Sequence, residues 1–268
     1  MTEPRRADVP DRVTDVRRVD ELPAHDFSPE RTGIDEVYVV VPARNEETTI
    51  AASLAAIDRA IEALGDEAPP VRVIVVLDRC TDGTEDLARA SGAECVISTI
   101  GRVGGARRLG IERALAASAA GRHIPLDRVW IANTDADSAV PTTWLRHHLH
   151  RARSGCDALV GIVSPRAEDL TSGELVVWKA RHPFGRDHEH VFGANLGVRA
   201  SAYRSVGGFE DIATGEDVRL VEALDASGAN VHRGQTQPVH TSGRRLGRAP
   251  EGFADYLSTL DDVACEAR

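Results

Sequence analysis

The sequence predicts an α/β domain built on a mainly parallel β-sheet with helices on both faces, and three observations support this. Through residue 153, short runs rich in valine and isoleucine alternate with longer segments of helical periodicity, which is typical of strand–helix–strand units with right-handed crossovers. The apolar runs are continuous, as expected for strands that are covered on both faces. A chain of 268 residues is also long enough for one large domain with a sizeable core.

The first strand–helix unit begins with the β-branched run at residues 37–41. The run breaks at Pro42, and apolar side chains then recur on one stripe between Ile50 and Leu64. This spacing predicts an amphipathic helix that packs one face on the sheet.

The second unit begins with a strand at residues 71–77, which ends at Asp78. A helix is expected from Glu85, with Thr84 as its N-cap, because a threonine hydroxyl can accept a hydrogen bond from the first turn. A third, short strand is predicted at residues 94–98.

A glycine-rich stretch at residues 101–110 leads into an alanine-rich helix that continues through Ala119. Arg107 follows Gly104 and Gly105 in this stretch. Glycines let the backbone approach a phosphate closely, and a helix N-terminus favours anions, so Arg107 is a candidate contact to a diphosphate. The alternative is an arginine on a solvated helix face.

The fourth strand, at residues 129–132, runs directly into Asp135 and Asp137. In extended backbone, side chains two residues apart point to the same side. Two carboxylates that close repel each other, and a divalent cation such as Mg²⁺ or Mn²⁺ relieves the repulsion. The alternative is an acidic turn that caps the helix expected after Pro141.

Polar residues follow three of the four predicted strands, at residues 44–46, at Asp78, and at Asp135 and Asp137. Ligands of parallel sheets bind at the carboxyl ends of the strands. We therefore expect these side chains to share one site.

The pattern is looser after residue 154. The expected elements are a strand at 158–163, a helix at 170–180, a strand and short helix at 192–198 and 200–206, a helix at 218–224, a strand-like segment at 231–240 and an amphipathic helix at 250–263.

The composition excludes several function classes. A net charge of −10 disfavours a general nucleic-acid binder, and the longest apolar runs are strand-sized, so no integral membrane segment is expected. The four cysteines are scattered, which favours a reducing, cytoplasmic location. Residues 1–33 are charged and aperiodic and are expected to form a flexible arm. The oligomeric state is not readable from the sequence.

Four segments, in order over residues 36–245, resemble the signatures of family 2 glycosyltransferases of the GT-A fold. They are Val-Pro-Ala-Arg-Asn-Glu-Glu at 41–47, Leu-Asp-Arg-Cys-Thr-Asp-Gly-Thr at 77–84, Asn-Thr-Asp-Ala-Asp at 133–137, and Gly-Ala-Asn at 193–195 followed by Gly-Gly-Phe at 207–209 and Gly-Glu-Asp at 215–217. Each segment alone is weakly specific, whereas the ordered set is specific. The resemblance implies a nucleotide-sugar-binding half at 34–140 and an acceptor half with the catalytic base at 141–268.

The resemblance further implies a metal-dependent transfer of a sugar from a UDP- or GDP-linked donor to an unidentified acceptor, with Mn²⁺ or Mg²⁺ as cofactor. Asp217 is the candidate general base and Glu216 the second candidate, although both carboxylates also suit a helix N-terminus. The predicted metal ligands are Asp137, Asp135 and His240. The predicted donor-binding residues are Pro42, Ala43, Arg44, Glu46, Asp78, Gly105, Arg107, Asp135, Ala136 and Arg244.

Two departures from the family pattern bear on specificity. Leu77 replaces the first aspartate of the second signature, and Arg79 replaces a glycine, which bears on base preference. No Gln-x-x-Arg-Trp segment, the mark of processive polymer synthases, is present, so a single transfer is expected. We separately expect the transfer to be inverting. The alternatives are a retaining transferase resembling glucosyl-phosphoglycerate synthases, a sugar-phosphate nucleotidyltransferase, and a binding module without catalysis.

Overall fold

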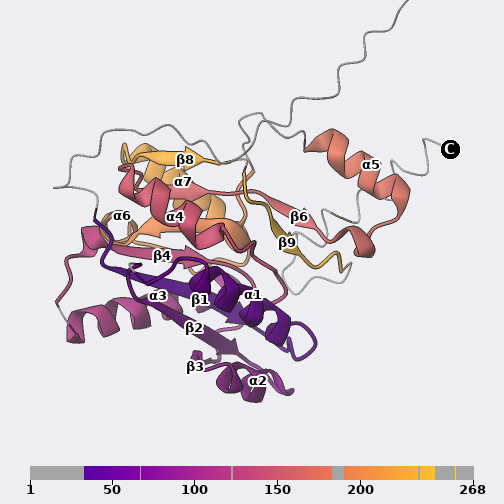
Figure 1. The fold of residues 1–268 in the computed structure, drawn as a ribbon, viewed down its shortest axis with the longest axis horizontal. Coiled ribbons are helices and arrows are strands. Elements are labelled where there is room, and N and C mark those ends of the chain that lie inside the picture. The colour runs from indigo at the N-terminus through magenta and orange to yellow at the C-terminus, as the bar shows by residue number, and fades with distance from the viewer. Residues whose placement is uncertain are drawn as a thin grey trace, which may run out of the picture.

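The computed structural model describes residues 33–66, 68–121, 123–182, 190–234, 236–244 and 257. In this part of the chain a seven-stranded sheet has the order β3-β2-β1-β4-β7-β5-β8, and a second sheet pairs β6 with β9 (Figure 1). The strands are β1 (Glu36–Ala43), β2 (Val71–Asp78), β3 (Glu94–Ser98), β4 (Val129–Asn133), β5 (Ala158–Val160), β6 (Val163–Pro165), β7 (Leu196–Arg199), β8 (Val231–Arg233) and β9 (Val239–Thr241). Only β7 runs antiparallel to its neighbours in the large sheet, which confirms the predicted mainly parallel architecture.

Helices cover both faces of the sheet. Val37, Val39 and Val41 of β1 pack in a core with α1, α2 and α4, whereas Tyr38 and Val40 pack with α3, α6 and α7 on the other face. Burial of every residue in the run explains why it is continuously apolar. The α-helices are α1 (Ile50–Glu62), α2 (Thr84–Ala90), α3 (Val103–Ala120), α4 (Trp144–Arg153), α5 (Ser172–Arg181), α6 (Ala200–Ser205) and α7 (Glu216–Ala226), and the short 3-10 helices are η1 (Leu126–Arg128), η2 (Ala167–Asp169) and η3 (Gly193–Asn195).

Two predicted segments lie outside the described residues. The arm at residues 1–33 does so except for Gly33, and the helix at 250–263 does so except for Leu257. The structure therefore bears on neither prediction.

The single strand expected at 158–163 is two strands in two different sheets. β5 ends at Val160, and a side chain at Gly161 would overlap Asn195. The Asn195 amide donates to the Ile162 carbonyl at 2.8 Å, which satisfies a backbone group where the chain leaves the large sheet. β6 then pairs with β9, and this pairing carries the 239–241 segment toward the end of β4.

A polar cluster lies buried beneath β4. The Trp130 indole donates to His148 Nδ1 at 3.1 Å, and the Trp144 indole donates to Asn195 Oδ1 at 2.9 Å. His148 has no solvent exposure, and burial lowers its pKa to about 3. The imidazole is therefore neutral in the folded protein throughout the physiological pH range.

This burial predicts acid sensitivity. Unfolded histidine binds a proton below about pH 6.5, whereas folded His148 does so only near pH 3, so stability is lost as pH falls below about 6.5. Between pH 6.5 and 5 the loss is about 2 kcal/mol from this group. Urea unfolding at pH 5 and pH 7 measures it, and His148→Gln is expected to show a smaller pH dependence. His123→Gln, at an exposed histidine, is the matched control. Equal slopes for wild type and His148→Gln would contradict the prediction.

Candidate functional site

Asp137 lies just beyond the carboxyl end of β4 and is 7% exposed. Its Oδ1 accepts from the hydroxyls of Thr241 at 3.3 Å and Ser138 at 3.4 Å, and its Oδ2 lies 3.1 Å from the Arg244 guanidinium. Burial, together with the neighbouring carboxylates of Asp135 and Glu46, raises the pKa of Asp137 to about 6 against the opposing effect of Arg244. The site therefore favours a cation beside this carboxylate.

Glu46 is a second carboxylate that pairs with the Arg244 guanidinium. Arg244 donates to both of its oxygens, at 2.9 and 3.1 Å. The Glu46 backbone N–H donates to the Thr84 hydroxyl at 2.7 Å, and that hydroxyl in turn donates to Asp82 at 2.5 Å. Thr84 thus joins the loops after β1 and β2 and does not cap α2, whose N-cap is Gly83.

The residues around Asp137 fit a divalent cation. Carboxylate oxygens are the ligands that Mg²⁺ and Mn²⁺ prefer, and Mg²⁺ is commonly held by one or two carboxylates with phosphate oxygens and water. Asp137 and Asp135 can supply those carboxylates. Among the described residues, no group of three or more histidine, cysteine, aspartate or glutamate side chains is arranged to hold a metal ion.

His240 is not brought into this group. Side chains alternate along β9, so Val239 and Thr241 are buried while His240 is exposed. Thr241, one residue further, makes the contact with Asp137. Metal ligation by His240 stays a prediction that this register does not favour.

Asp78 is buried at the end of β2. Its carboxylate accepts from the Ser98 hydroxyl at 2.8 Å and from the Gly101 N–H at 2.8 and 3.0 Å. Arg79 has a positive φ of 55° and donates to the carbonyls of Thr99 and Ile100 at 2.9 and 3.3 Å. Together these two side chains fix the loop between β3 and α3 beside the site.

Arg107 is buried between two carboxylates. Its Nη2 donates to Asp135 Oδ1 at 2.7 Å, and its Nη1 pairs with Glu216 Oε1. Only 4% of the Arg107 side chain is exposed, so its environment differs from a solvated helix face. Both terminal nitrogens of Arg107 thus face protein carboxylates, and its contact with a diphosphate stays a prediction.

Asp217 and Glu216 open α7 but differ in accessibility. Asp217 is half-buried, and its oxygens accept from the Gly193 N–H at 2.7 Å and the Val218 N–H at 2.9 Å. Glu216 is buried, which raises its pKa against the effect of Arg107. Asp217 is therefore the more exposed of the two carboxylates, while Glu216 is engaged in an ion pair.

The other predicted donor residues occupy supporting positions. Pro42 and Ala43 form the end of β1, Ala136 is buried, and Arg44 is half-buried in the following loop. Gly105 is buried, and a Cβ there would lie 2.5 Å from the Ile100 side chain.

Sequence reasoning missed three contacts around the site. Thr241 and Ser138 bond the Asp137 carboxylate, and Arg166 donates to the Asp137 carbonyl at 3.0 Å. Strand alternation could have pointed to Thr241 in place of His240. Nothing local in the sequence signals Arg166, because its position follows from the turn between β6 and α5.

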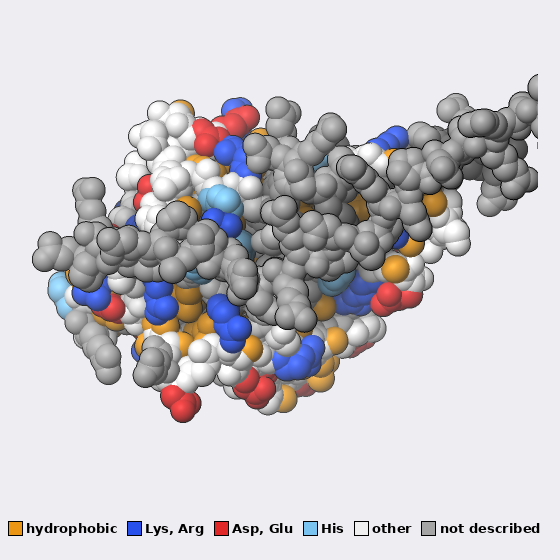
Figure 2. Space-filling view, turned by 45° about the horizontal axis from the view of Figure 1, so that its top comes forward, with side chains coloured by type: hydrophobic (Ala, Val, Ile, Leu, Met, Phe, Trp, Pro, Cys, Tyr) orange, Lys and Arg blue, Asp and Glu red, His pale blue; other side chains and the backbone are white. Residues whose placement is uncertain are grey.

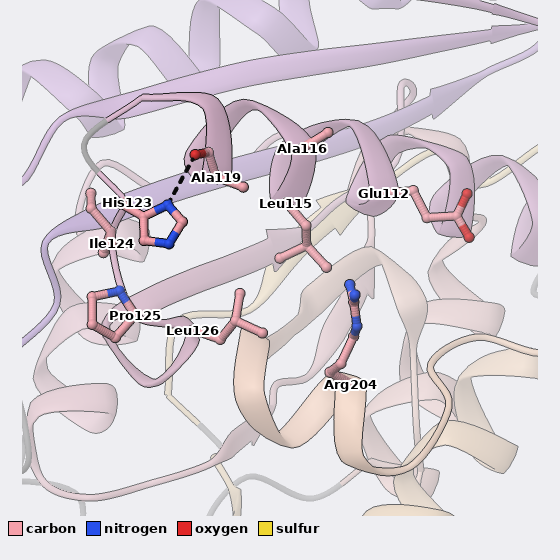
Figure 3. Close-up of a pocket in the computed structure, with 9 residues that line it drawn as sticks. All are labelled: Glu112, Leu115, Ala116, Ala119, His123, Ile124, Pro125, Leu126 and Arg204. Atoms are coloured by element: carbon pink, nitrogen blue, oxygen red, sulfur yellow. Dashed lines mark hydrogen bonds between the residues drawn. The ribbon is translucent and has the colours of Figure 1, made fainter.

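An apolar groove of about 590 Å³ lies elsewhere (Figure 3). Leu115 and Ala119 of α3 face Leu126 of η1, with Arg204 of α6 at one end. η1 precedes the amino end of β4, whereas Asp135 follows its carboxyl end, so the groove lies at the opposite edge of the sheet. We do not assign it to the site.

The charge on the visible face and the length of the helices are relevant to binding of nucleic acids and membranes. On the face shown in Figure 2, basic side chains (Lys or Arg) are spread with acidic ones among them. Within the described part of the chain, no helix is both long and apolar enough to cross a membrane.

The sequence model of the family described as Glycosyl transferase family 2 matches residues 38–204, more than half of the chain. No curated protein matches the sequence of this chain significantly.

Solved structures share the fold. S. aureus TarS 1-349 in complex with UDP-GlcNAc has a TM-score of 0.57 at 14% identity over 85% of this chain and 66% of that one. The mannosyltransferase PcManGT from Pyrobaculum calidifontis in complex with GDP-Man and Mn²⁺ has a TM-score of 0.53 at 18% identity, over 90% and 77%. Glucosyl-3-phosphoglycerate synthase from Mycobacterium tuberculosis with Mg²⁺ and UDP has a TM-score of 0.52 at 18% identity, over 87% and 80%. The chain spans less than two thirds of the length of the TarS structures.

Proposed function

The chain belongs to glycosyl transferase family 2 and has the GT-A fold, and from this premise we propose that it transfers a sugar from a nucleotide diphosphate sugar to an acceptor hydroxyl in a metal-dependent reaction. The observation that carries the proposal is that Asp78 and the Asp135–Asp137 pair lie at the carboxyl ends of the parallel strands β2 and β4, while Arg107 bridges Asp135 to Glu216, the residue before Asp217 in α7. The similar structures were solved with UDP-GlcNAc, UDP or GDP-Man, so a UDP- or GDP-sugar is the donor class.

The donor binds along the ends of β1, β2 and β4 in this proposal. The segment from Pro42 to Glu46 and Asp78 form the nucleotide end, and Arg244, which lies between Glu46 and Asp137, is placed to contact the diphosphate. A divalent cation held by Asp137 with Asp135 would neutralise negative charge on the leaving diphosphate. His240 remains a third, less favoured ligand for it.

Asp217 acts as the general base. An acceptor hydroxyl has a pKa far above 7, so removal of its proton during attack lowers the barrier. Two backbone N–H groups orient the Asp217 carboxylate. Attack by an acceptor activated on the face opposite the leaving group inverts the anomeric carbon, and we propose a single inverting transfer.

A retaining transfer is the second candidate, because glucosyl-3-phosphoglycerate synthase is among the similar structures. The anomeric configuration of the product distinguishes the two. A nucleotidyltransferase would release pyrophosphate from a nucleoside triphosphate, and a binding module without catalysis would leave donor intact in the presence of Mn²⁺.

Thermal unfolding with nucleotide diphosphates tests donor binding. A ligand at about 100 times its Kd stabilises the native state by about 2.7 kcal/mol, which raises the Tm of a chain of this size by roughly 5–10 °C. We expect UDP or GDP with Mn²⁺ to give such a shift, and either component alone to give a much smaller one. ADP with Mn²⁺ is the control for nonspecific binding. The absence of a shift for every nucleotide would contradict the proposed function.

A further inference from the structure

Arg107 connects two segments that are distant in sequence and assigned to different halves of the reaction. One terminal nitrogen of its guanidinium bonds Asp135 at 2.7 Å and the other pairs with Glu216. Asp135 follows β4 on the donor side, and Glu216 begins α7 immediately before Asp217. A single cation thus holds the donor aspartate and the helix that carries the proposed base.

The surrounding chain makes room for this bridge. A side chain at Gly193 would overlap the Arg107 guanidinium, and a Cβ at Gly104 would lie 2.7 Å from Cγ of Glu216. Gly193 also donates its N–H to Asp217 at 2.7 Å. The residue that packs on the guanidinium is therefore the same residue that orients Asp217.

Burial makes Arg107 and its two carboxylate partners, Asp135 and Glu216, depend strongly on one another. The side chains of Arg107 and Glu216 are each only 4% exposed, and a buried charge that loses its partner is strongly destabilised. A second cation at Asp135 would weaken the attraction of this carboxylate for Arg107, so we expect the guanidinium to shift toward Glu216. Because Glu216 and Gly193 adjoin Asp217, a change on the donor side reaches the base.

We propose that Arg107 is a positioning residue that couples occupancy of the donor site at Asp135 to the position of α7 and Asp217. This inference rests on the proposed function of the site and assigns Arg107 to coupling in place of direct contact with the diphosphate. It requires that Asp135 and Glu216 influence each other energetically, although Arg107 separates them.

A double-mutant cycle tests the coupling. The Kd of the nucleotide diphosphate that binds with Mn²⁺, UDP or GDP, is measured by calorimetry for wild type, Asp135→Asn, Glu216→Gln and the double variant. Residues in one ion-pair network typically interact by amounts that correspond to at least about a twofold change in affinity, so we expect the effects to be non-additive by that factor or more. Additive effects within twofold would overturn the inference.

Two further variants separate coupling from simple loss of charge or of folding. Asp211→Asn removes an exposed acid that pairs with Arg102 of the loop before α3, near the same segment, and its effect is expected to be additive with Asp135→Asn. Arg107→Lys keeps the charge, but an ammonium group cannot reproduce the fixed two-pronged geometry, so the Asp135–Glu216 coupling is expected to vanish in that background. Persistence of the coupling there would show that Arg107 is not the link.

The outcomes also distinguish this inference from the proposed function. If wild type binds neither UDP nor GDP with Mn²⁺, both proposals are overturned. If wild type binds but the cycle is additive, only the coupling fails. Should Glu216→Gln fail to fold, as judged by circular dichroism, the cycle is run between Asp135→Asn and Arg107→Lys, where the same twofold threshold applies.

Discussion

Replacing Asp137 with asparagine is expected to lower the Mn²⁺-dependent affinity for UDP or GDP by at least about 100-fold, since removal of even the outer contacts of a metal site costs about 10- to 100-fold in affinity. Asparagine has nearly the same shape and can still accept hydrogen bonds from Thr241 and Ser138 through its carbonyl oxygen. It lacks the charge and the second oxygen acceptor. Calorimetric titration of the nucleotide, with and without Mn²⁺, measures the effect.

The stability of the variant shows whether the fold is intact. The raised pKa of Asp137, about 6, means that the folded protein binds a proton at this group more readily than the unfolded chain does. The ionised carboxylate therefore opposes folding at pH 7, and Asp137→Asn is expected to be no less stable than wild type without ligand. Asp127→Asn, in η1 near the other end of β4, is the control for affinity. Unchanged Mn²⁺-dependent binding in Asp137→Asn would refute the metal assignment.

The same pKa gives this affinity a pH dependence. A cation binds the ionised carboxylate, so protonation competes with it. Since the pKa of Asp137 is about 6, the affinity for Mn²⁺ is expected to fall as pH drops below that value.

The ordering of the strands explains why such a site could be found from sequence at all. Asp135 and Asp137 follow β4 directly, and Asp78 ends β2, so local pattern and parallel topology suffice to place them together.

Contacts that depend on distant segments could not be predicted in this way. The sequence indicates that Arg107 lies near the start of a helix, but its partner Glu216 is 109 residues away, and only the packing of α7 on α3 brings them together. The prediction of His240 rests on the resemblance, which implies a metal-binding histidine in this region, and on the suitability of a neutral imidazole for Mn²⁺. The register of β9 is fixed by its bonds to Ala139 and by its pairing with β6. A shift of this register by one residue would exchange the buried and exposed side chains, and the local sequence does not determine the register to that precision.

The break at Gly161 has a similar origin. Residues 158–163 read as one strand, since each is apolar or glycine. The strand ends because Asn195 occupies the space beside Gly161 and takes the Ile162 carbonyl. This asparagine also accepts from Trp144, so a buried tertiary contact determines the element boundary, overriding a favourable local pattern.

Replacing Asp217 with asparagine is expected to reduce turnover by about 10²- to 10⁴-fold, the usual contribution of a general base, while donor affinity stays within about twofold. The asparagine carbonyl can still accept from the Gly193 N–H, so the backbone around η3 is retained and only the proton acceptor is lost. Because the acceptor is unidentified, turnover is followed as nucleotide release from the UDP- or GDP-sugar, with water as the substitute acceptor.

The matched control lies on the same helix. Asp225 is an acidic residue of α7 whose carboxylate pairs with Arg233 at 2.6 Å, and Asp225→Asn is expected to leave both turnover and donor affinity near wild-type values. If Asp217→Asn loses donor affinity and turnover together, its role is binding and not proton transfer. Near-normal turnover would instead exclude Asp217 as the base, and because Glu216 is buried against Arg107, it would favour a mechanism in which the acceptor or the donor itself supplies the base.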